Sequence, residues 1–299
     1  MIVCMKISNL LIVSTIMPIF RINPIASMGV SNNKNTPVNT FSNAIKSIRN
    51  VDVDKKGGVI LVLGKKNISR DNIHLLGQQI PRIIRGKSPY PMLFLNEEAK
   101  NEFKQSIDSL RKASDSIKGK STDAIVGRAL ISAAKNQTDF SMANVQLELY
   151  RKIYITGHGS AGISHIYSGD SKFTVLEIVD LLENHGILDK IKDVRITCCN
   201  SADKREVKDL SQESVELANR SSSFIENLFY GEQKSLIEKL SSEIWDRGYT
   251  DVRISGYHGK GVFYNSKDIP LSHLRSSTIP ATDTVKRKSL RVTLESDLD

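Results

Sequence analysis

The chain has 299 residues, of which 39% are hydrophobic and 25% are charged, as in ordinary globular proteins. This length allows one large domain with tails or two small domains. The net charge of +9 favours a polyanionic partner: nucleic acid, an anionic membrane or a phosphorylated small molecule. Nucleic acid is the least favoured of these, because the chain has no zinc-finger spacing and no aromatic-rich RNA-binding signature.

Residues 1–54 differ in composition from the rest and are predicted to be a disordered secretion or targeting leader. The apolar run 10–20 is too short to span a bilayer as a helix. It resembles a Sec signal peptide, although Arg21 fits badly inside one. Residues 27–43, rich in Ser, Asn, Thr and Pro, also suit the unfolded leader of a bacterial protein exported through a needle-type secretion machine. Met28 is an alternative start.

Strand-like and helix-like patterns alternate along the rest of the chain. The expected elements are strand 59–63, helix 70–84, strand 90–95, helices 96–117 and 123–134, strands 145–150 and 152–156, helix 174–184, strand 194–197, a loop or partial helix 203–220, helix 223–247 and strands 251–255 and 261–264. This alternation predicts an α/β fold with a largely parallel central sheet, helices on both faces and a C-terminal β-hairpin. We expect one domain over 55–268, followed by a basic C-terminal tail, 269–299, with a possible added strand at 290–294.

Two expected strands end in residues that can carry chemistry. The strand 152–156 is followed by Gly157-His158-Gly159, and the strand 194–197 is followed by Cys198-Cys199-Asn200. Active sites of open α/β sheets form at the carboxyl edge of the strands, so a histidine and a cysteine there can meet. An imidazole beside a thiol raises its thiolate fraction and makes it a nucleophile. The pattern therefore predicts a Cys–His catalytic pair.

The two adjacent cysteines differ in their expected exposure. Side chains alternate along a strand, so Cys198 continues the buried face of Val194 and Ile196, whereas Cys199 lies at the turn. Buried thiols are usually inert, which favours Cys199 as the nucleophile. The competing interpretations are a second core cysteine at position 199, a turn histidine without chemistry at position 158, and a metal site. Known zinc patterns separate paired cysteines by two to four residues, so the sequence predicts no metal. The remaining cysteine is Cys4, and the chain shows no disulfide framework, which indicates a reducing working compartment.

These motifs resemble those of the caspase-like cysteine peptidases. The best match is to the inositol-hexakisphosphate-activated protease domains of MARTX toxins and large clostridial toxins. The resemblance rests on the runs 156–160 and 199–200, on the opening strand with its helix, and on the late runs 252–259 and 261–264. It covers roughly residues 55 to 266, and the short length with a polar leader is similar to type III effectors built on this domain.

The resemblance implies a catalytic dyad in which Cys199 attacks the scissile carbonyl and His158 transfers protons. The backbone N–H of Gly159, with one near Cys199, would stabilise the oxyanion. Some members orient the histidine with an acidic residue, which no motif places here. Asp170 and Asp203 lie nearby in sequence, and we interpret both as solvated loop carboxylates.

Inositol hexakisphosphate, the activator that the resemblance implies, would need a pocket of basic side chains. The candidates lie at strand and helix ends and in the late hairpin: Lys65, Lys66, Arg70, Arg82, Arg85, Lys87 and Lys260, with the cluster Lys286-Arg287-Lys288 as a possible addition.

The expected protein is a secreted bacterial virulence effector that acts in the host cytoplasm as a cysteine endopeptidase. Its partners would be a host protein, cut after an aliphatic residue such as leucine, an inositol polyphosphate and a secretion chaperone. Two alternatives stay open: a non-proteolytic caspase-like interaction module, and a thiol enzyme that performs deamidation or acyl transfer.

Overall fold

The computed structural model describes residues 57–64, 74–113, 117–223, 228–229, 231–262, 273–275 and 285–297. The expected leader, 1–54, and the activator candidates Lys65, Lys66 and Arg70 lie outside these residues.

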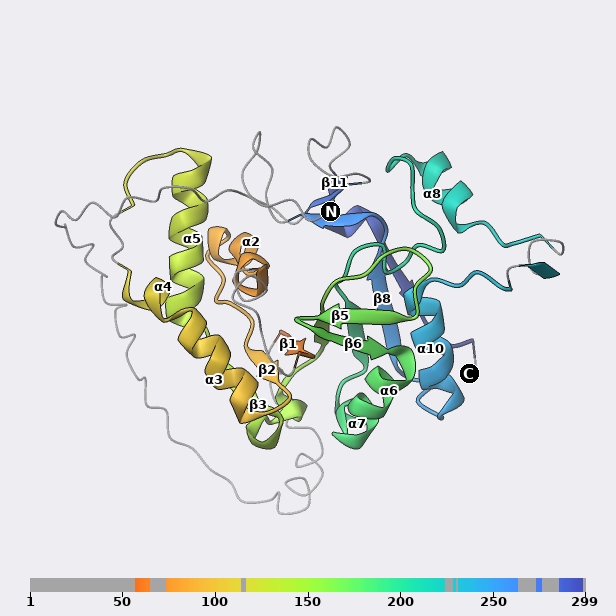
Figure 1. Cartoon of the computed structure of the whole chain (residues 1–299), viewed down its shortest axis with the longest axis horizontal. Coiled ribbons are helices and arrows are strands. Elements are labelled where there is room, and N and C mark those ends of the chain that lie inside the picture. Colours follow the sequence, from red (N-terminus) through yellow and green to blue (C-terminus); the bar gives the residue numbers. More distant parts are fainter. Residues whose placement is uncertain are drawn as a thin grey trace, which may run out of the picture.

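The centre of the molecule is a seven-stranded sheet of an α/β fold (Figure 1). In spatial order its strands are β12 (Arg291–Leu294), β8 (Arg253–Tyr257), β7 (Asp193–Ile196), β4 (Ile153–Thr156), β1 (Val59–Val62), β2 (Met92–Phe94) and β3 (Asp139–Ser141). Neighbouring strands are parallel except β8 and β12, which are antiparallel. The prediction of a largely parallel central sheet is therefore confirmed, and the added C-terminal strand is β12.

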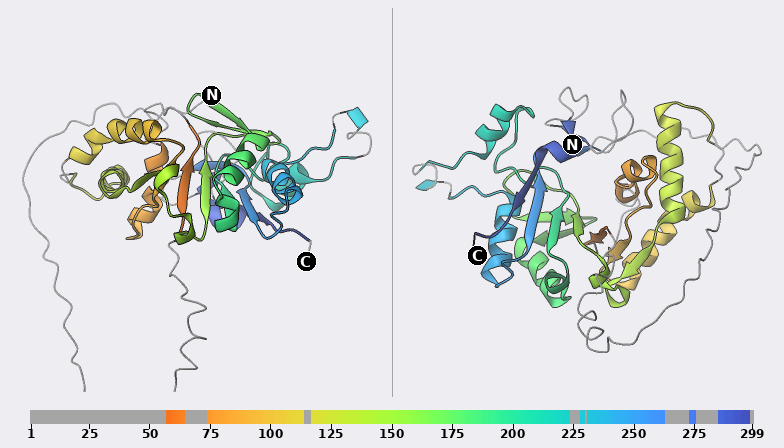
Figure 2. Two further views of the ribbon diagram at one scale, coloured as in Figure 1. Left: turned by 90° about the horizontal axis from the view of Figure 1, so that it is seen from below. Right: turned by 180° about the vertical axis from the view of Figure 1, so that it is seen from behind.

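Two groups of helices cover the sheet (Figures 1 and 2). On one face α6 (Val175–Asn184), α7 (Ile187–Lys190) and α10 (Leu236–Asp246) bury apolar side chains against β1, β4, β7 and β8. On the other face the segment 74–77, α3 (Glu97–Ser106) and α5 (Thr122–Asn136) pack on β1 and β2. Strand β1, with the sequence VILV, is buried along its whole length because both groups cover it.

Shorter elements complete the described chain. The helices are α2 (Ile80–Ile84), α4 (Asp108–Lys112) and α8 (Gln212–Asn219), and the 3₁₀ turns are η1 (Met142–Asn144), η2 (Leu147–Leu149) and η3 (Arg287–Leu290). An antiparallel pair is formed by β5 (His165–Ser168) and β6 (Ser171–Thr174). A small sheet contains β9 (Lys260–Val262), β10 (His273–Arg275) and β11 (Val285–Lys286).

Three expected elements differ from the structure. The expected helix 96–117 consists of two helices, α3 and α4, which are separated at Ile107. The expected strand 145–150 contains the 3₁₀ turn η2, in which the buried side chains are Leu147 and Tyr150. Their spacing of three residues is the 3₁₀ period and not the strand period. The expected helix 223–247 is not continuous: 228–229 are helical, 231–235 are not, and α10 begins at Leu236. The Ser235 hydroxyl and the Glu238 carboxylate form a capping box there. Gly231 precedes it with φ +70°, outside the helical region.

The expected C-terminal hairpin is only partly present. Antiparallel strands occur in this region, but they belong to two sheets: β8 pairs with β7 and β12, whereas β9 pairs with β10. The turn at His258-Gly259 therefore carries the chain from the large sheet to the small one. Within the part of the chain that the structure describes, no helix combines the length and the apolar character needed to cross a membrane.

Candidate functional site

The strand ends that carry His158 and Cys199 are neighbours. Strands β4 and β7 are adjacent and parallel, with Ile153, Tyr154 and Ile155 opposite Val194, Arg195 and Ile196. The pairing continues one residue further, because the Thr197 N–H donates to the Ile155 carbonyl at 2.9 Å. A continued register would place His158 opposite Cys199 at the carboxyl edge of the sheet.

The loop that carries His158 is held by strand β5. The His158 N–H donates to the Tyr167 carbonyl at 2.7 Å, and the Tyr167 N–H donates to the His158 carbonyl at 3.0 Å. Gly157 is needed here, since a Cβ atom at this position would lie 2.3 Å from Ile166 Cγ2 and 2.6 Å from the Tyr167 carbonyl oxygen. The His158 side chain itself is exposed, and the ring of His74 lies edge-on with its centroid 6.2 Å away.

Gly159 brings the two loops into direct contact. A Cβ atom on Gly159 would lie 2.8 Å from Cys198 Sγ, 3.2 Å from Cys198 Cβ and 3.2 Å from the Cys199 carbonyl oxygen. Real Cβ atoms do not approach other atoms as closely as 2.8 Å, so only glycine fits without a shift. The backbone of the Gly-His-Gly loop therefore rests on the two cysteines.

The two cysteines have different environments. Cys198 is 3% exposed and belongs to the core that α6 and α10 form with the sheet, whereas Cys199 is partly exposed. The expectation of a buried Cys198 beside a more exposed Cys199 is confirmed. Burial raises the pKa of the Cys198 thiol well above its ordinary range, because the thiolate would lose its hydration. Its burial therefore favours Cys199, the more exposed of the two thiols, as the candidate nucleophile.

The two acidic candidates for orienting the histidine lie in different surroundings. Asp170 is exposed, as expected for a solvated loop residue. Asp203 is fully buried, so its interpretation as a solvated carboxylate is wrong. It does not pair with His158 in any contact described here; its carboxylate accepts a hydrogen bond of 2.6 Å from Nδ1 of His258. Asn200 follows Cys199 with φ 54°, which makes it the non-glycine residue with positive φ among those described.

A polar, basic face of the sheet was not anticipated. The apolar cluster under α3 and α5 ends at Tyr154 of β4, and beyond it the same face carries polar side chains. The registers of β4, β7, β8 and β12 place one group of cations on it, which we call the basic sheet face: Lys152, Arg195, Arg253 and Arg291. Burial, followed by the charge of Arg195, lowers the pKa of the Lys152 ammonium.

Aromatic rings lie beside these cations. The Arg195 guanidinium lies 5.7 Å from the centre of the Tyr154 ring, and that of Arg287 lies 3.9 Å from the centre of the Tyr257 ring. Two acidic neighbours compensate part of the charge. Asp193 forms two hydrogen bonds with Arg195, at 2.9 and 2.7 Å, and Arg253 lies 3.9 Å from Asp193 and 3.7 Å from Glu295. The sequence indicated these cations, since a basic residue recurs on the same side of several expected strands. The strand order was needed to show that the four side chains lie on one face of the sheet.

The structure describes four of the expected activator residues, Arg82, Arg85, Lys87 and Lys260. The Arg82 guanidinium lies 3.5 Å from the centre of the Tyr90 ring, which in turn contacts the Tyr154 ring at 5.1 Å, so Arg82 borders the basic sheet face. Arg85 and Lys87 are exposed in the turn after α2. The Lys260 ammonium forms an ion pair of 2.5 Å with Glu206.

Comparisons with known proteins add no identification. No protein-family model matches the sequence, and no curated protein shows significant similarity to it. Among the described residues, no three His, Cys, Asp or Glu side chains are grouped as ligands of one metal ion.

Proposed function

We propose that this protein is a cysteine endopeptidase of the caspase-like type, with Cys199 as nucleophile and His158 as the group that transfers protons. The observation that carries the proposal is the contact between the two strand ends. Gly159 rests on Cys198 and on the Cys199 carbonyl, next to a partly exposed thiol and an exposed imidazole at the carboxyl edge of the sheet.

The reaction follows from these groups. The Cys199 sulfur, as thiolate, attacks the carbonyl carbon of the scissile peptide bond, and the electron pair of the C=O bond moves to oxygen. The N–H of Gly159 and one at the Cys199 turn stabilise that oxyanion. When the C–N bond breaks, protonated His158 gives a proton to the leaving amine, and the thioester remains. Water, deprotonated by His158, then hydrolyses the thioester and releases the carboxylate product and the free thiol.

The surplus positive charge suggests how such a site is controlled. We propose that inositol hexakisphosphate, a dense polyanion of eukaryotic cytosol, binds the basic sheet face and activates the enzyme. Strand β7 connects this face to the proposed nucleophile, since it carries Arg195 and leads directly into the turn with Cys199. A protein of this kind is a secreted bacterial effector that becomes active in the host cell and cleaves a host protein after an aliphatic residue such as leucine.

A labelling experiment tests the proposal. The protein is incubated with a peptidyl acyloxymethyl ketone that ends in leucine, with and without inositol hexakisphosphate, and the modified residue is found by mass spectrometry. We expect labelling of Cys199 that depends on the polyanion and is lost in Cys199→Ala and in His158→Ala, whereas Cys198→Ala is still labelled.

Other outcomes separate the alternatives. Loss of labelling in Cys198→Ala but not in Cys199→Ala would show that the nucleophile is wrongly assigned. No labelling under any condition would favour a non-proteolytic interaction module. Labelling of Cys199 without cleavage of any peptide ending in an aliphatic residue would favour deamidation or acyl transfer, which use the same thiol.

A further inference from the structure

The turn that carries Cys199 is joined to the turn between β8 and β9 through one buried carboxylate. Asp203 is fully buried, and four N–H donors surround its two oxygens. Oδ1 accepts from His258 Nδ1 at 2.6 Å and from Asn219 Nδ2 at 3.1 Å. Oδ2 accepts from the Gly259 backbone N–H at 2.8 Å and from Asn200 Nδ2 at 3.1 Å. A carboxylate accepts about four hydrogen bonds, so its capacity is filled.

Backbone hydrogen bonds run parallel to these side-chain contacts. The Asn200 N–H donates to the Gly259 carbonyl at 2.7 Å, and the Ala202 N–H donates to the Tyr257 carbonyl at 3.2 Å. Ser201 adds a third connection, because its hydroxyl accepts from the Tyr257 N–H at 2.9 Å. The residues immediately after Cys199 are therefore attached to the end of β8 at three consecutive positions.

Asn200 shows why this attachment matters for the nucleophile. Its φ of 54° lies in the left-handed region, which asparagine adopts more readily than other residues with a side chain. The side-chain amide of Asn200 donates to the Asp203 carboxylate, and the Asp203 backbone N–H donates to the Asn200 backbone carbonyl at 3.0 Å. The peptide unit between Cys199 and Asn200 is held by the Gly259 carbonyl, which accepts from the Asn200 N–H. Asp203 in turn binds the Gly259 N–H and the neighbouring His258, so it orients that peptide through the β8–β9 turn.

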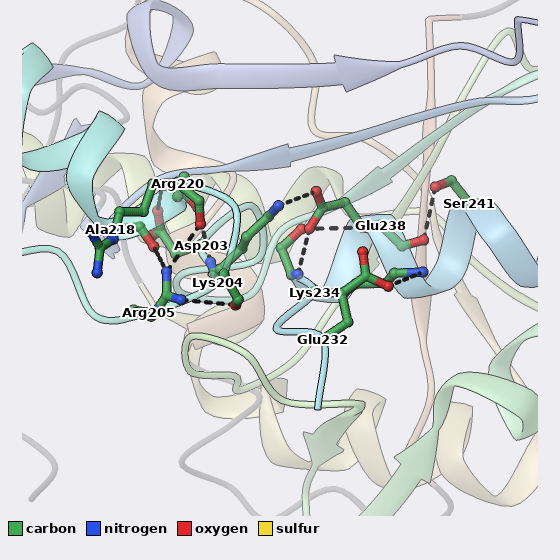
Figure 3. A network of polar contacts seen from close by, with 12 residues as sticks. Asp203, Lys204, Arg205, Ala218, Arg220, Glu232, Lys234, Glu238 and Ser241 are labelled. Atoms are coloured by element: carbon green, nitrogen blue, oxygen red, sulfur yellow. Dashed lines mark hydrogen bonds and ion pairs between the residues drawn. The ribbon is translucent and has the colours of Figure 1, made fainter. Parts of the chain in front are cut away.

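The surroundings hold Asp203 itself in place. The neighbouring Lys204 is fixed by its N–H to Asn219 Oδ1 at 2.9 Å and by an ion pair of 3.1 Å with Glu238 of α10. Arg205 donates to the carbonyl oxygens of Ala218 and Arg220 at the end of α8 (Figure 3). The carboxylate is therefore anchored by α8 and α10, and it is coupled to the β8–β9 turn by the His258 side chain and the Gly259 N–H.

We propose that Asp203 and His258 are a positioning pair for Cys199: the charged hydrogen bond between them holds the Cys199–Asn200 peptide in its reactive orientation. This inference rests on the proposed function of Cys199. The proposal gives Asp203 a partner other than His158, and it gives His258 a role that requires only a donor at Nδ1. Neither residue exchanges protons with the substrate.

Three substitutions and two matched controls test the pair. Asp203→Asn keeps the shape but turns an N–H₂ group towards at least one of the N–H donors. His258→Leu removes the donor, whereas His258→Asn restores an N–H at the place of Nδ1. Asp170→Asn and His185→Ala are the controls, because Asp170 and His185 are exposed and far from these contacts in the chain.

The readout is the rate of Cys199 labelling by the acyloxymethyl ketone at saturating inositol hexakisphosphate, with Cys198 as an internal reporter of folding. Loss of a buried charged hydrogen bond corresponds to roughly a 10- to 100-fold change, so we expect such a decrease for Asp203→Asn and for His258→Leu. His258→Asn should recover to within about threefold of the unsubstituted protein. Cys198 should stay unlabelled by iodoacetamide, which separates a positioning effect from unfolding.

Each outcome decides the matter. If the unsubstituted protein is not labelled at all, the proposed function is wrong and the positioning role falls with it. If it is labelled and Asp203→Asn keeps its rate, only the positioning role is wrong. If His258→Asn is as slow as His258→Leu while Cys198 stays protected, the imidazole itself is required and the positioning role is again overturned. If Asp203→Asn exposes Cys198, that variant is unfolded and its labelling rate is not informative. The positioning role is then tested by comparing the labelling rates of His258→Leu and His258→Asn, which both keep the Asp203 carboxylate.

Discussion

At the scale of single residues, a glycine and a buried thiol define the site. Gly159 lets the His158 loop touch the Cys198 side chain and the Cys199 carbonyl, and Cys198 is part of the core beneath them. The same packing that buries Cys198 leaves its neighbour Cys199 partly exposed at the turn.

Gly159→Ala is expected to abolish most of the activity. The added Cβ atom would lie 2.8 Å from Cys198 Sγ, so the two strand ends must move apart. Overpacking of this kind costs about 1–3 kcal/mol of stability, and a displaced dyad lowers the labelling rate of Cys199 by about 100-fold. Gly261→Ala is the matched control, because a Cβ atom there meets nothing within 4 Å. Equal labelling rates for Gly159→Ala and Gly261→Ala would contradict the close contact between Gly159 and the two cysteines.

The buried thiol predicts a loss of stability at high pH. The pKa of Cys198 is raised by burial, so above the ordinary thiol pKa of about 8.5 the unfolded chain releases a proton that the folded chain retains. Stability contributed by this thiol is complete below pH 8.5 and decreases above it, by at most about 1.4 kcal/mol per pH unit. Urea unfolding between pH 7.5 and 10 should show a smaller decrease for Cys198→Ala than for the unsubstituted protein. Identical slopes would mean that Cys198 ionises in the folded state.

At the scale of elements, strand order determines which residues can act together. Lys152, Arg195, Arg253 and Arg291 come from four strands that are widely separated in the sequence, and the registers place them on one face. On the opposite face the same strands carry Ile153, Val194, Ile254 and Val292, which pack against α6 and α10. In this half of the sheet, one face is therefore basic and polar and the other packs in the hydrophobic core.

The double variant Lys152→Gln/Arg291→Gln should bind inositol hexakisphosphate more weakly. Each charge contact with a phosphate contributes roughly a tenfold change in the dissociation constant, so we expect about 100-fold for the pair. Isothermal titration calorimetry at two salt concentrations measures the effect, because a polyanion interaction also weakens with salt. Lys190→Gln, which removes an exposed charge on α7 at the other face, is the control. Unchanged binding in the double variant would place the activator elsewhere.

At the scale of the whole molecule, the proposed activator site and the proposed catalytic residues share the central sheet. β7 carries Arg195 and ends at the cysteines, and β8 carries Arg253 and ends at His258. A ligand that draws these strands together stabilises the fold and the site at the same time.

Inositol hexakisphosphate should therefore raise the melting temperature. A ligand at 100 times its dissociation constant stabilises the folded state by about 2.7 kcal/mol. For a domain of this size that corresponds to a shift of roughly 5–10 °C. Differential scanning calorimetry should show the shift with the unsubstituted protein and with Cys199→Ala, since the thiol is not part of the basic sheet face. A shift lost in Cys199→Ala would argue against two separate sites.

The sequence by itself was sufficient for the fold class and for the two strand ends. Buried strands such as VILV at 59–62 and the glycines around His158 are local signals, and local signals are read reliably from a single chain. It was also sufficient to separate Cys198 from Cys199, because the alternation of side chains along a strand is a local property. The true start of helix α10 and the 3₁₀ turn η2 were missed, since a capping box and tertiary packing override the wider periodicity there.

Only the tertiary structure decided which distant residues become partners. The pairing of Asp203 with His258 and the gathering of Lys152, Arg195, Arg253 and Arg291 depend on strand order and register. These are properties of contacts between segments far apart in the chain, and no local pattern encodes them. The burial that turns Asp203 from a loop carboxylate into the centre of a hydrogen-bond network is likewise a property of the assembled fold.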